Sequence, residues 1–225
     1  MKRTAIFLPG WGTHSVTSSV HKILLNRLNI FTEIYCIFEP GMGIKQPIPA
    51  LTYQLHEYIT QNILDKSDEI TIIGHSMGGV MALDLLQSYK DVREQTKAAI
   101  TIASPLKGAN NSIHLASIFS RSSTDMIKNS PFLENLGKNI HMLKDIPTLH
   151  LTASLDLLIP TKNTYFHTAN ALQQTIPACD HLSILFKKRT AQEINGWTQY
   201  KIFNGIDNII KEISPKLVFT DIPQI

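Results

Sequence analysis

The sequence predicts an α/β fold, in which a mainly parallel sheet of about six strands carries helices on both faces. Short apolar runs rich in β-branched residues alternate with longer segments whose apolar residues recur every three or four positions. Strict alternation of this kind favours parallel strands joined by crossover helices. The 225 residues suit one domain, and 43% hydrophobic and 17% charged residues are typical of a globular protein.

The N-terminal quarter of the chain contains two strand and helix pairs. Thr4–Leu8 is a short apolar run that ends at a Pro-Gly turn, so we expect a strand there. Ser15–Leu28 has apolar residues at helical spacing, and Glu33–Phe38 is a second apolar strand. A loop rich in glycine and proline then leads to a helix over roughly Leu51–Leu64.

The middle of the chain continues the same alternation. Ile70–Ile73 is an unbroken β-branched run and is expected to form the third strand. A helix is expected from Ser76 to about Tyr89, because small and apolar residues there follow a helical pattern. Ala98–Ala103, apolar apart from one threonine, is the fourth expected strand.

The C-terminal part is expected to supply two further strands and end in a helix. Pro147–Thr152 is the fifth strand, and a helix is expected within Lys162–Asn170. Gln173–Ile176 makes a short sixth strand, and Ala191–Ile213 has the longest helical pattern of the chain. Residues 215–225, which begin at a proline, are expected to form a C-terminal tail.

The segment at residues 107–145 breaks the alternation between the fourth and fifth strands. It is rich in Ser and Asn but carries scattered apolar residues. A connection this long inside a compact domain usually has a function or helices of its own. We predict a small, mostly helical lid within a single domain of residues 1–214, and a surface excursion without a role in binding is the alternative.

The pentapeptide Gly74-His75-Ser76-Met77-Gly78 carries the strongest chemical signal. A β-branched strand enters it and the small-residue run Gly79–Leu83 leaves it. A Gly-x-Ser-x-Gly turn between a strand and a helix is the context of a nucleophile elbow, which holds the serine hydroxyl at the positive end of the helix. We therefore predict that Ser76 is a nucleophile rather than a solvated serine in an ordinary turn.

A serine nucleophile needs a histidine base, and that base needs a carboxylate to fix its tautomer. Asp156 follows the fifth strand, at the sheet edge where the elbow lies, and is the first candidate acid. Asp180 and Asp125 are rival acids, and a helix-capping aspartate is the alternative reading of Asp156. His181 follows the last expected strand, where a loop can place it over Ser76.

An oxyanion intermediate needs two N–H donors. The backbone N–H of Met77, directly after the nucleophile, is the first candidate. The second is expected from the loop after the first strand, where we choose the N–H of Trp11 because it follows Gly10. His75 also adjoins Ser76, but it is expected to point away from the site and into the structure.

Taken together, these residues resemble the α/β-hydrolase family of esterases and lipases. Four separated motifs match in order, namely Pro9-Gly10-Trp11-Gly12, Gly74–Gly79, Ser154–Pro160 and Asp180–Ser183. Ser104–Gly108 also resembles the Ser/Thr-Pro-x-x-Gly turn of lipase-like members. The likeness spans about residues 4–190. The two strands that usually precede the oxyanion loop are absent, as in minimal bacterial lipases, and Pro-Gly replaces the usual His-Gly.

The resemblance implies two-step acyl transfer by Ser76, with His181 as the base, Asp156 holding that base, and the amides of Met77 and Trp11 stabilising the oxyanion. It implies no metal and no organic cofactor. We expect a serine hydrolase of carboxylic esters, of lipid or acyl type, that works through an acyl-enzyme. An acyltransferase or a thioesterase with the same triad is the alternative.

Apolar side chains near these motifs are expected to bind the acyl chain. Ile159 and Leu182 are the candidate substrate-binding residues, together with Trp11 and the apolar residues of the 107–145 segment. The expected partner is therefore a small-molecule or lipid ester, with transient contact to a lipid surface.

Charge and composition exclude other classes of function. A formal net charge of +3 is too small to indicate nucleic-acid binding, and no apolar segment is long enough to span a membrane. The first apolar run is too short for a signal-peptide core, so we expect a cytoplasmic location, with secretion without a signal as the alternative. The two cysteines, Cys36 and Cys179, form no zinc-binding pattern, and no feature requires a disulfide between them.

Overall fold

The computed structural model describes residues 2–13, 19–38, 46–110, 120–202 and 215–221. Seven strands form its sheet: β1 Arg3–Leu8, β2 Glu33–Phe38, β3 Glu69–His75, β4 Thr96–Ile102, β5 Thr148–Ala153, β6 Ala171–Ile176 and β7 Lys216–Asp221. They lie in the order β6-β5-β4-β3-β1-β2-β7, and every neighbouring pair is parallel. The six strands expected from the sequence are all present.

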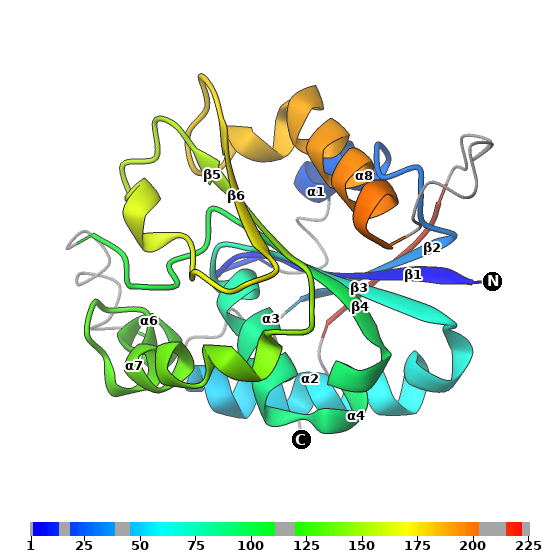
Figure 1. Ribbon diagram of the computed structural model, residues 1–225, viewed down its shortest axis with the longest axis horizontal. Coiled ribbons are helices and arrows are strands. Elements are labelled where there is room, and N and C mark those ends of the chain that lie inside the picture. The colour runs from blue at the N-terminus through cyan, green and yellow to red at the C-terminus, as the bar shows by residue number, and fades with distance from the viewer. Residues whose placement is uncertain (1, 14–18, 39–45, 111–119, 203–214, 222–225) are drawn as a thin grey trace.

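Helices cover both faces of the sheet, as Figure 1 shows. The α-helices are α1 Ser19–Leu25, α2 Ile48–Asn62, α3 Met77–Ser88, α4 Lys90–Gln95, α6 Arg121–Asp125, α7 Pro131–Lys138 and α8 Lys188–Ile202. Helices α1 and α8 lie on one side, and α2, α3 and α4 lie on the other. Each side has its own cluster of buried apolar residues, so the sheet is the middle layer of a three-layer core.

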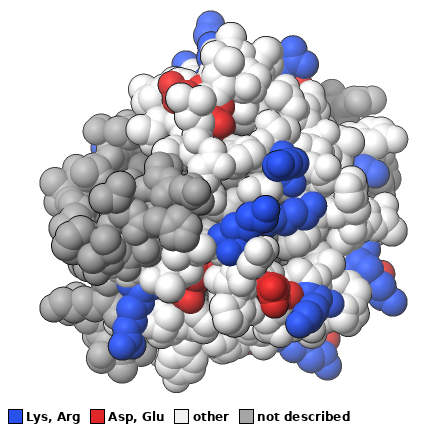
Figure 2. All heavy atoms as spheres, turned by 90° about the vertical axis from the view of Figure 1, so that its left-hand side faces the viewer, with Lys and Arg blue, Asp and Glu red and all other residues white. Residues whose placement is uncertain are grey.

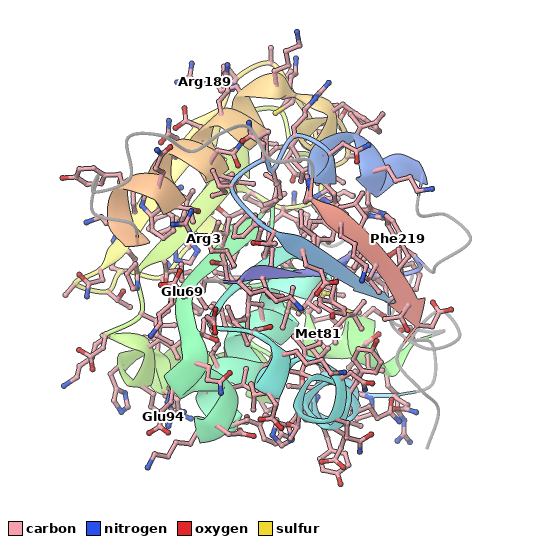
Figure 3. The ribbon with its side chains drawn as sticks, turned by 90° about the vertical axis from the view of Figure 1, so that its right-hand side faces the viewer. Arg3, Glu69, Met81, Glu94, Arg189 and Phe219 are labelled. Atoms are coloured by element: carbon pink, nitrogen blue, oxygen red, sulfur yellow. The ribbon has the colours of Figure 1, made fainter. Side chains whose placement is uncertain are left out.

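The seventh strand corrects the expected C-terminal tail. Residues 216–221 form β7, which pairs with β2 in register from Glu33 opposite Lys216 to Phe38 opposite Asp221. Phe219 stacks on Phe38 with 6.4 Å between the ring centroids, and Figure 3 shows β7 beside β2 at the sheet edge. The sheet therefore has seven strands rather than six. An edge strand has one sheet neighbour, so it buries less surface than the central strands and its apolar signal is weaker.

Several helices also differ from expectation: α1 ends at Leu25 rather than Leu28, and α2 begins at Ile48 rather than near Leu51. Within Lys162–Asn170 the backbone forms only a short 3-10 turn at Thr161–Asn163, and Thr164 bonds its side chain back to the Thr161 carbonyl at 2.7 Å. Such local side-chain bonds compete with helix formation. The last helix begins at Lys188, earlier than expected, and residues 203–213 of the expected helix lie outside the described residues, as do residues 15–18 of the first expected helix.

The described part of the 107–145 segment is helical and packs on the core. It contains α6, α7 and a 3-10 turn at Ile140–Leu143, whereas residues 111–119 lie outside the described residues. Met126, Leu133, Leu136 and Leu143 are buried in the same cluster as the inner faces of α2 and α3. This part of the segment is therefore built into the domain, and its role as a lid stays a prediction. No described helix is both long and apolar enough to cross a bilayer.

Candidate active site

The elbow between β3 and α3 holds Ser76 in a strained conformation. Ser76 has φ 53° and ψ −123°, a positive φ that is costly for a residue with a side chain. Its N–H donates to the carbonyl of Ile102 at 2.8 Å, which fixes the turn to β4. A Cβ on Gly78 would lie 2.0 Å from the Leu8 carbonyl oxygen, so only glycine lets α3 start this close to β1. The half-buried serine thus lies between the ends of β1 and β4, the two strands that flank β3.

A continuous hydrogen-bonded chain joins three of the predicted site residues. His181 Nε2 lies 2.9 Å from Ser76 Oγ, and His181 Nδ1 lies 2.8 Å from Asp156 Oδ2. When Nδ1–H donates to the carboxylate, Nε2 is left as the acceptor for the serine hydroxyl. The side chains of His181 and Asp156 are only 12% and 2% exposed, so little water competes with either bond.

The second carboxylate oxygen of Asp156 also accepts hydrogen bonds. Asp156 Oδ1 accepts hydrogen bonds from the N–H groups of Leu158 and Ile159, both at 2.9 Å. The carboxylate therefore closes its own turn and points Oδ2 at the histidine. Ile159, which we expected to contact substrate, is only 1% exposed, and the contact that the structure shows for it is this backbone bond.

The two rival acids have other partners. Asp180 is exposed and caps the turn after it, where Leu182 and Ser183 donate their N–H groups to its Oδ1 at 3.0 and 2.9 Å. Hydrogen bonds from Ser183 and Leu182 lower the pKa of Asp180. Asp125 accepts the N–H of Ile48 at the start of α2, at 2.7 Å, and burial raises its pKa. Asp156 is the carboxylate that the structure brings to His181.

The loops that carry the acid and the histidine are joined to each other. The N–H of Leu155 donates to the Cys179 carbonyl at 2.9 Å, and the N–H of Ala178 donates to Ser154 Oγ at 2.9 Å. These bonds lie just before Asp156 and just before His181. They fix the separation of the two loops where the catalytic geometry depends on it.

His75 is buried, as expected, but its ring lies against His181 rather than away from the site, a contact that sequence reasoning did not find. Its Nε2–H donates to the backbone carbonyl of His181 at 2.9 Å, and the two rings lie 5.0 Å apart. Burial, with a smaller repulsion from His181, lowers the pKa of His75 to about 3, so the ring is neutral near pH 7. His75 therefore anchors the loop of His181 to the end of β3, directly before Ser76.

The predicted oxyanion donors lie on the two segments that flank Ser76. Met77 is the first residue of α3, where a backbone N–H has no partner within the helix. On the other side the loop before Trp11 is close enough that a Cβ on Gly10 would lie 3.1 Å from the Cβ of Ser76. The Thr13 hydroxyl closes this loop by donating to the Gly10 carbonyl at 2.6 Å.

The side chain of Trp11 links the oxyanion loop to the 107–145 segment. Its Nε1–H donates to Ser120 Oγ at 3.1 Å, and Ser120 is also the N-cap of α6, where it accepts the N–H of Ser123 at 3.4 Å. The sequence carries no signal for this contact, because the two residues are 109 positions apart.

Comparison with known proteins assigns the family. The family model of the PGAP1-like alpha/beta domain matches residues 49–196, which is more than half of the chain. The chain belongs to this family. Its matched region includes the Ser76 elbow and the loops of Asp156 and His181. No curated protein sequence matches the chain.

Solved structures of lipases and esterases share the fold of this chain at low sequence identity. The monoacylglycerol lipase of Paleococcus ferrophilus is 12% identical, with a TM-score of 0.60 over 86% of this chain and 93% of that chain. Est1E from Butyrivibrio proteoclasticus is 14% identical, with a TM-score of 0.61 over 90% and 89%. Phospholipase PlaB from Legionella pneumophila is 13% identical, with a TM-score of 0.68; the match covers 95% of this chain and 63% of that protein. The fold is thus the α/β-hydrolase fold of lipases and esterases.

Exposed leucines lie next to Asp156 and His181 in the sequence of this α/β hydrolase. Leu157 and Leu182 are 85% and 57% exposed, and Leu155 and Leu158 are exposed beside them. Leu182, a predicted substrate-binding residue, directly follows the histidine, whereas the other three flank Asp156. The loops that carry Asp156 and His181 therefore present apolar side chains to solvent. Within the described residues, no group of His, Cys, Asp or Glu side chains is arranged to hold a metal ion.

Proposed function

We propose that this chain is a serine hydrolase that cleaves carboxylic esters through an acyl-enzyme on Ser76. The observation that carries the proposal is the unbroken chain from Ser76 Oγ through His181 to Asp156, at 2.9 and 2.8 Å. These distances suit proton transfer from the hydroxyl to a positioned base. Membership of a lipase/esterase-like family supports the same class of reaction.

In the proposed mechanism Ser76 Oγ attacks the ester carbonyl while His181 Nε2 takes its proton. Asp156 holds Nδ1–H and stabilises the imidazolium that forms. The N–H groups of Met77 and Trp11 stabilise the oxyanion. His181 then gives its proton to the leaving alcohol, and in the second step it activates water to release the acid and free Ser76.

The substrate class we propose is an apolar acyl ester, lipid esters included. The exposed leucines on both sides of the triad give an apolar surface for an acyl chain and for transient contact with a lipid surface. A monoacylglycerol lipase and a phospholipase among the similar structures are consistent with this class. The start of α6 would form the wall beside the proposed oxyanion loop, because Ser120 accepts a hydrogen bond from the Trp11 side chain.

The test is a rate profile over p-nitrophenyl esters of increasing acyl length. We expect Ser76→Ala to lower kcat by roughly 10⁴-fold or more, because the nucleophile is lost. Ser88→Ala is the matched control, since this exposed serine ends the same helix and should leave the rate unchanged. Unchanged hydrolysis by Ser76→Ala would refute the proposal.

Two further readouts define the chemistry. A pre-steady-state burst of p-nitrophenol would show that an acyl-enzyme accumulates. Adding an alcohol or a thiol as a competing acceptor distinguishes hydrolysis from acyl transfer. An acyltransferase should form mostly the acylated acceptor at millimolar acceptor concentration, whereas a hydrolase should still release mostly the free acid. A maximal rate at acetate would contradict the long-chain lipid ester as substrate.

A further inference from the structure

A basic hollow lies outside the triad, between α7 and the segment that follows the Asp156 loop. Its volume is about 510 Å³, and three lysines line it: Lys107 after β4, Lys128 before α7, and Lys162 in the 3-10 turn. These elements lie on the left of Figure 1, and Figure 2 shows that basic side chains gather at the centre of that face. Nothing in the proposed ester hydrolysis uses these three residues.

The three lysine-bearing segments are joined to one another. The N–H of Lys107 donates to the Asn163 carbonyl at 2.9 Å, and Asn163 Nδ2 donates to the Gly108 carbonyl at 2.7 Å. Gly108 has φ 94°, and a Cβ there would lie 2.4 Å from the Cα of Lys128. Because a glycine occupies this position, the segment of Lys128 packs directly against the segment of Lys107. The hollow is thus a built feature of the fold.

Lys107 is held in place without being neutralised. Its Nζ lies 4.6 Å from the ring centroid of Tyr165 and 5.9 Å from that of Phe166, which also lines the hollow. Cation–π contacts orient an ammonium but leave its net charge. Among the residues that the structure describes, no carboxylate forms an ion pair with Lys107, Lys128 or Lys162. Three unneutralised cations around one hollow repel each other and favour an anion between them.

The charge of the lining indicates which anion fits. Three lysines and one carboxylate, Glu134, give the hollow a formal charge of +2. A phosphomonoester carries about −1.5 to −2 at pH 7, which nearly neutralises this charge, and lysine binds phosphate as a point charge. We propose that this hollow is a binding site for a phosphate group, supplied either by a soluble phosphomonoester or by a lipid headgroup.

The proposed site is separate from the reaction. Asn110, two residues after Gly108, donates its N–H to the Leu158 carbonyl and its Nδ2–H to the Leu157 carbonyl, both at 2.9 Å. This strip of chain packs on the loop that carries Asp156. None of Ser76, Asp156 and His181 lines the hollow, so phosphate binding does not require Ser76 and can be measured whether or not the ester hydrolysis proposal holds.

The test is isothermal titration of the Ser76→Ala protein at low ionic strength with inorganic phosphate and with glycerol phosphate. The pocket variant combines Lys107→Gln, Lys128→Gln and Lys162→Gln. The matched control combines Lys97→Gln, Lys138→Gln and Lys144→Gln, three exposed lysines outside the hollow that remove the same total charge. We expect the pocket variant to weaken binding at least about tenfold and the control to change it little.

Glu134→Gln gives an opposite prediction, since removal of the one negative charge should tighten phosphate binding. Thermal unfolding of each variant verifies that it is folded. Absence of phosphate binding to the parent protein would overturn the proposal. An equal loss of phosphate affinity in the control variant would also overturn it, because that result indicates general attraction to a positive surface.

Vesicles distinguish the two sources of phosphate. Phosphatidylcholine vesicles with and without phosphatidic acid offer a lipid phosphomonoester. Vesicle binding that needs phosphatidic acid, is reversed by inorganic phosphate and is lost in the pocket variant assigns the site to a lipid headgroup. Binding of glycerol phosphate without vesicle binding assigns it to a soluble ligand. Either result supports the site, whereas vesicle binding that the pocket variant retains would contradict it.

Discussion

A buried, paired carboxylate lies at each of two edges of the sheet: the amino edge, where the parallel strands begin, and the carboxyl edge, where they end. At the amino edge, Glu33 lies 2.7 Å from Lys2 Nζ and 3.0 Å from Lys216 Nζ, and its side chain is only 6% exposed. At the carboxyl edge, Asp156 is equally buried and pairs with His181. The amino-edge cluster ends on two ammonium groups, whereas the carboxyl-edge chain continues through an imidazole to Ser76 Oγ.

The two clusters are therefore expected to affect different properties of the protein, namely its stability and its reaction rate. A buried, paired carboxylate costs free energy when its partner is lost, wherever it lies. Only a carboxylate whose partner can pass a proton to a further group contributes to a reaction. The comparison therefore predicts that changes at the carboxyl edge affect rate, and that changes at the amino edge affect the free energy of unfolding.

Among changes that leave Ser76 in place, the largest effect is expected for Asp156→Asn. The amide can still accept the N–H groups of Leu158 and Ile159, but it cannot hold His181 in the tautomer that accepts the serine proton. We expect kcat for a p-nitrophenyl ester to fall about 10⁴-fold, with little change in the unfolding midpoint. Asp180→Asn is the control, and a larger loss there than in Asp156→Asn would reverse the assignment of the acid.

His75→Ala tests whether the base must be anchored from the nucleophile strand. Without the Nε2–H that the His181 carbonyl accepts, the base is less well placed, and a misplacement of about 1 Å costs on the order of 100-fold in rate. We expect kcat to fall about 10- to 100-fold while KM changes little.

His75→Gln is the matched variant, because its amide keeps an N–H donor near the position of Nε2. We expect it to recover part of the lost kcat. Equal kcat losses in the two variants, at equal thermal stability, would show that the hydrogen bond to the His181 carbonyl is not what matters. Because the pKa of His75 is about 3, its own titration should not affect rates measured near neutral pH.

A smaller effect on rate is expected for Ser120→Ala, which removes the acceptor of Trp11 Nε1–H. Loss of one such bond is worth about 1 kcal/mol, or about fivefold in kcat if it shifts the oxyanion loop. Ser130→Ala is the matched control, since Ser130 caps α7 as Ser120 caps α6 but does not contact Trp11. Both variants should lose similar stability, and a similar loss of rate in both would disprove the link.

The carboxyl edge could be predicted from the sequence to a greater extent than the amino edge. Ser76 and Asp156 each follow an apolar strand, and the motif order places them with His181 at one sheet edge, where the structure brings the three together. The contact between His75 and the His181 carbonyl joins residues 106 positions apart, and no local pattern encodes it. The same holds for the three lysines of the basic hollow, which lie on separate segments.

The sequence predicts the amino edge less completely, because β7 is the outermost strand of the sheet and follows a proline. Residues 216–221 fall in the expected tail, although Leu217–Phe219 is a short apolar run followed by a threonine. What fixes the strand is its pairing with β2 and the ion pair to Glu33, both of which depend on residues far away in the sequence.

Glu33→Gln should leave the rate unchanged and lower the free energy of unfolding by about 2 kcal/mol, because Lys2 and Lys216 lose their shared partner. Burial raises the pKa of Glu33, but hydrogen bonds from Lys2, Lys216 and Tyr35 outweigh it and bring the pKa from 4.5 down to about 2. The folded-state pKa thus lies below the unfolded value. The stabilisation is complete above pH 4.5 and is lost as the pH falls toward 2.

Urea unfolding of the parent protein and Glu33→Gln at several pH values checks this expectation. The difference between them should be largest near neutral pH and shrink below pH 4.5. Lys90→Gln is the control, since it breaks an exposed i,i+4 pair with Glu94 and should cost less than about 0.5 kcal/mol at any pH. A drop in kcat of Glu33→Gln without a drop in stability would contradict the division of roles between the two sheet edges.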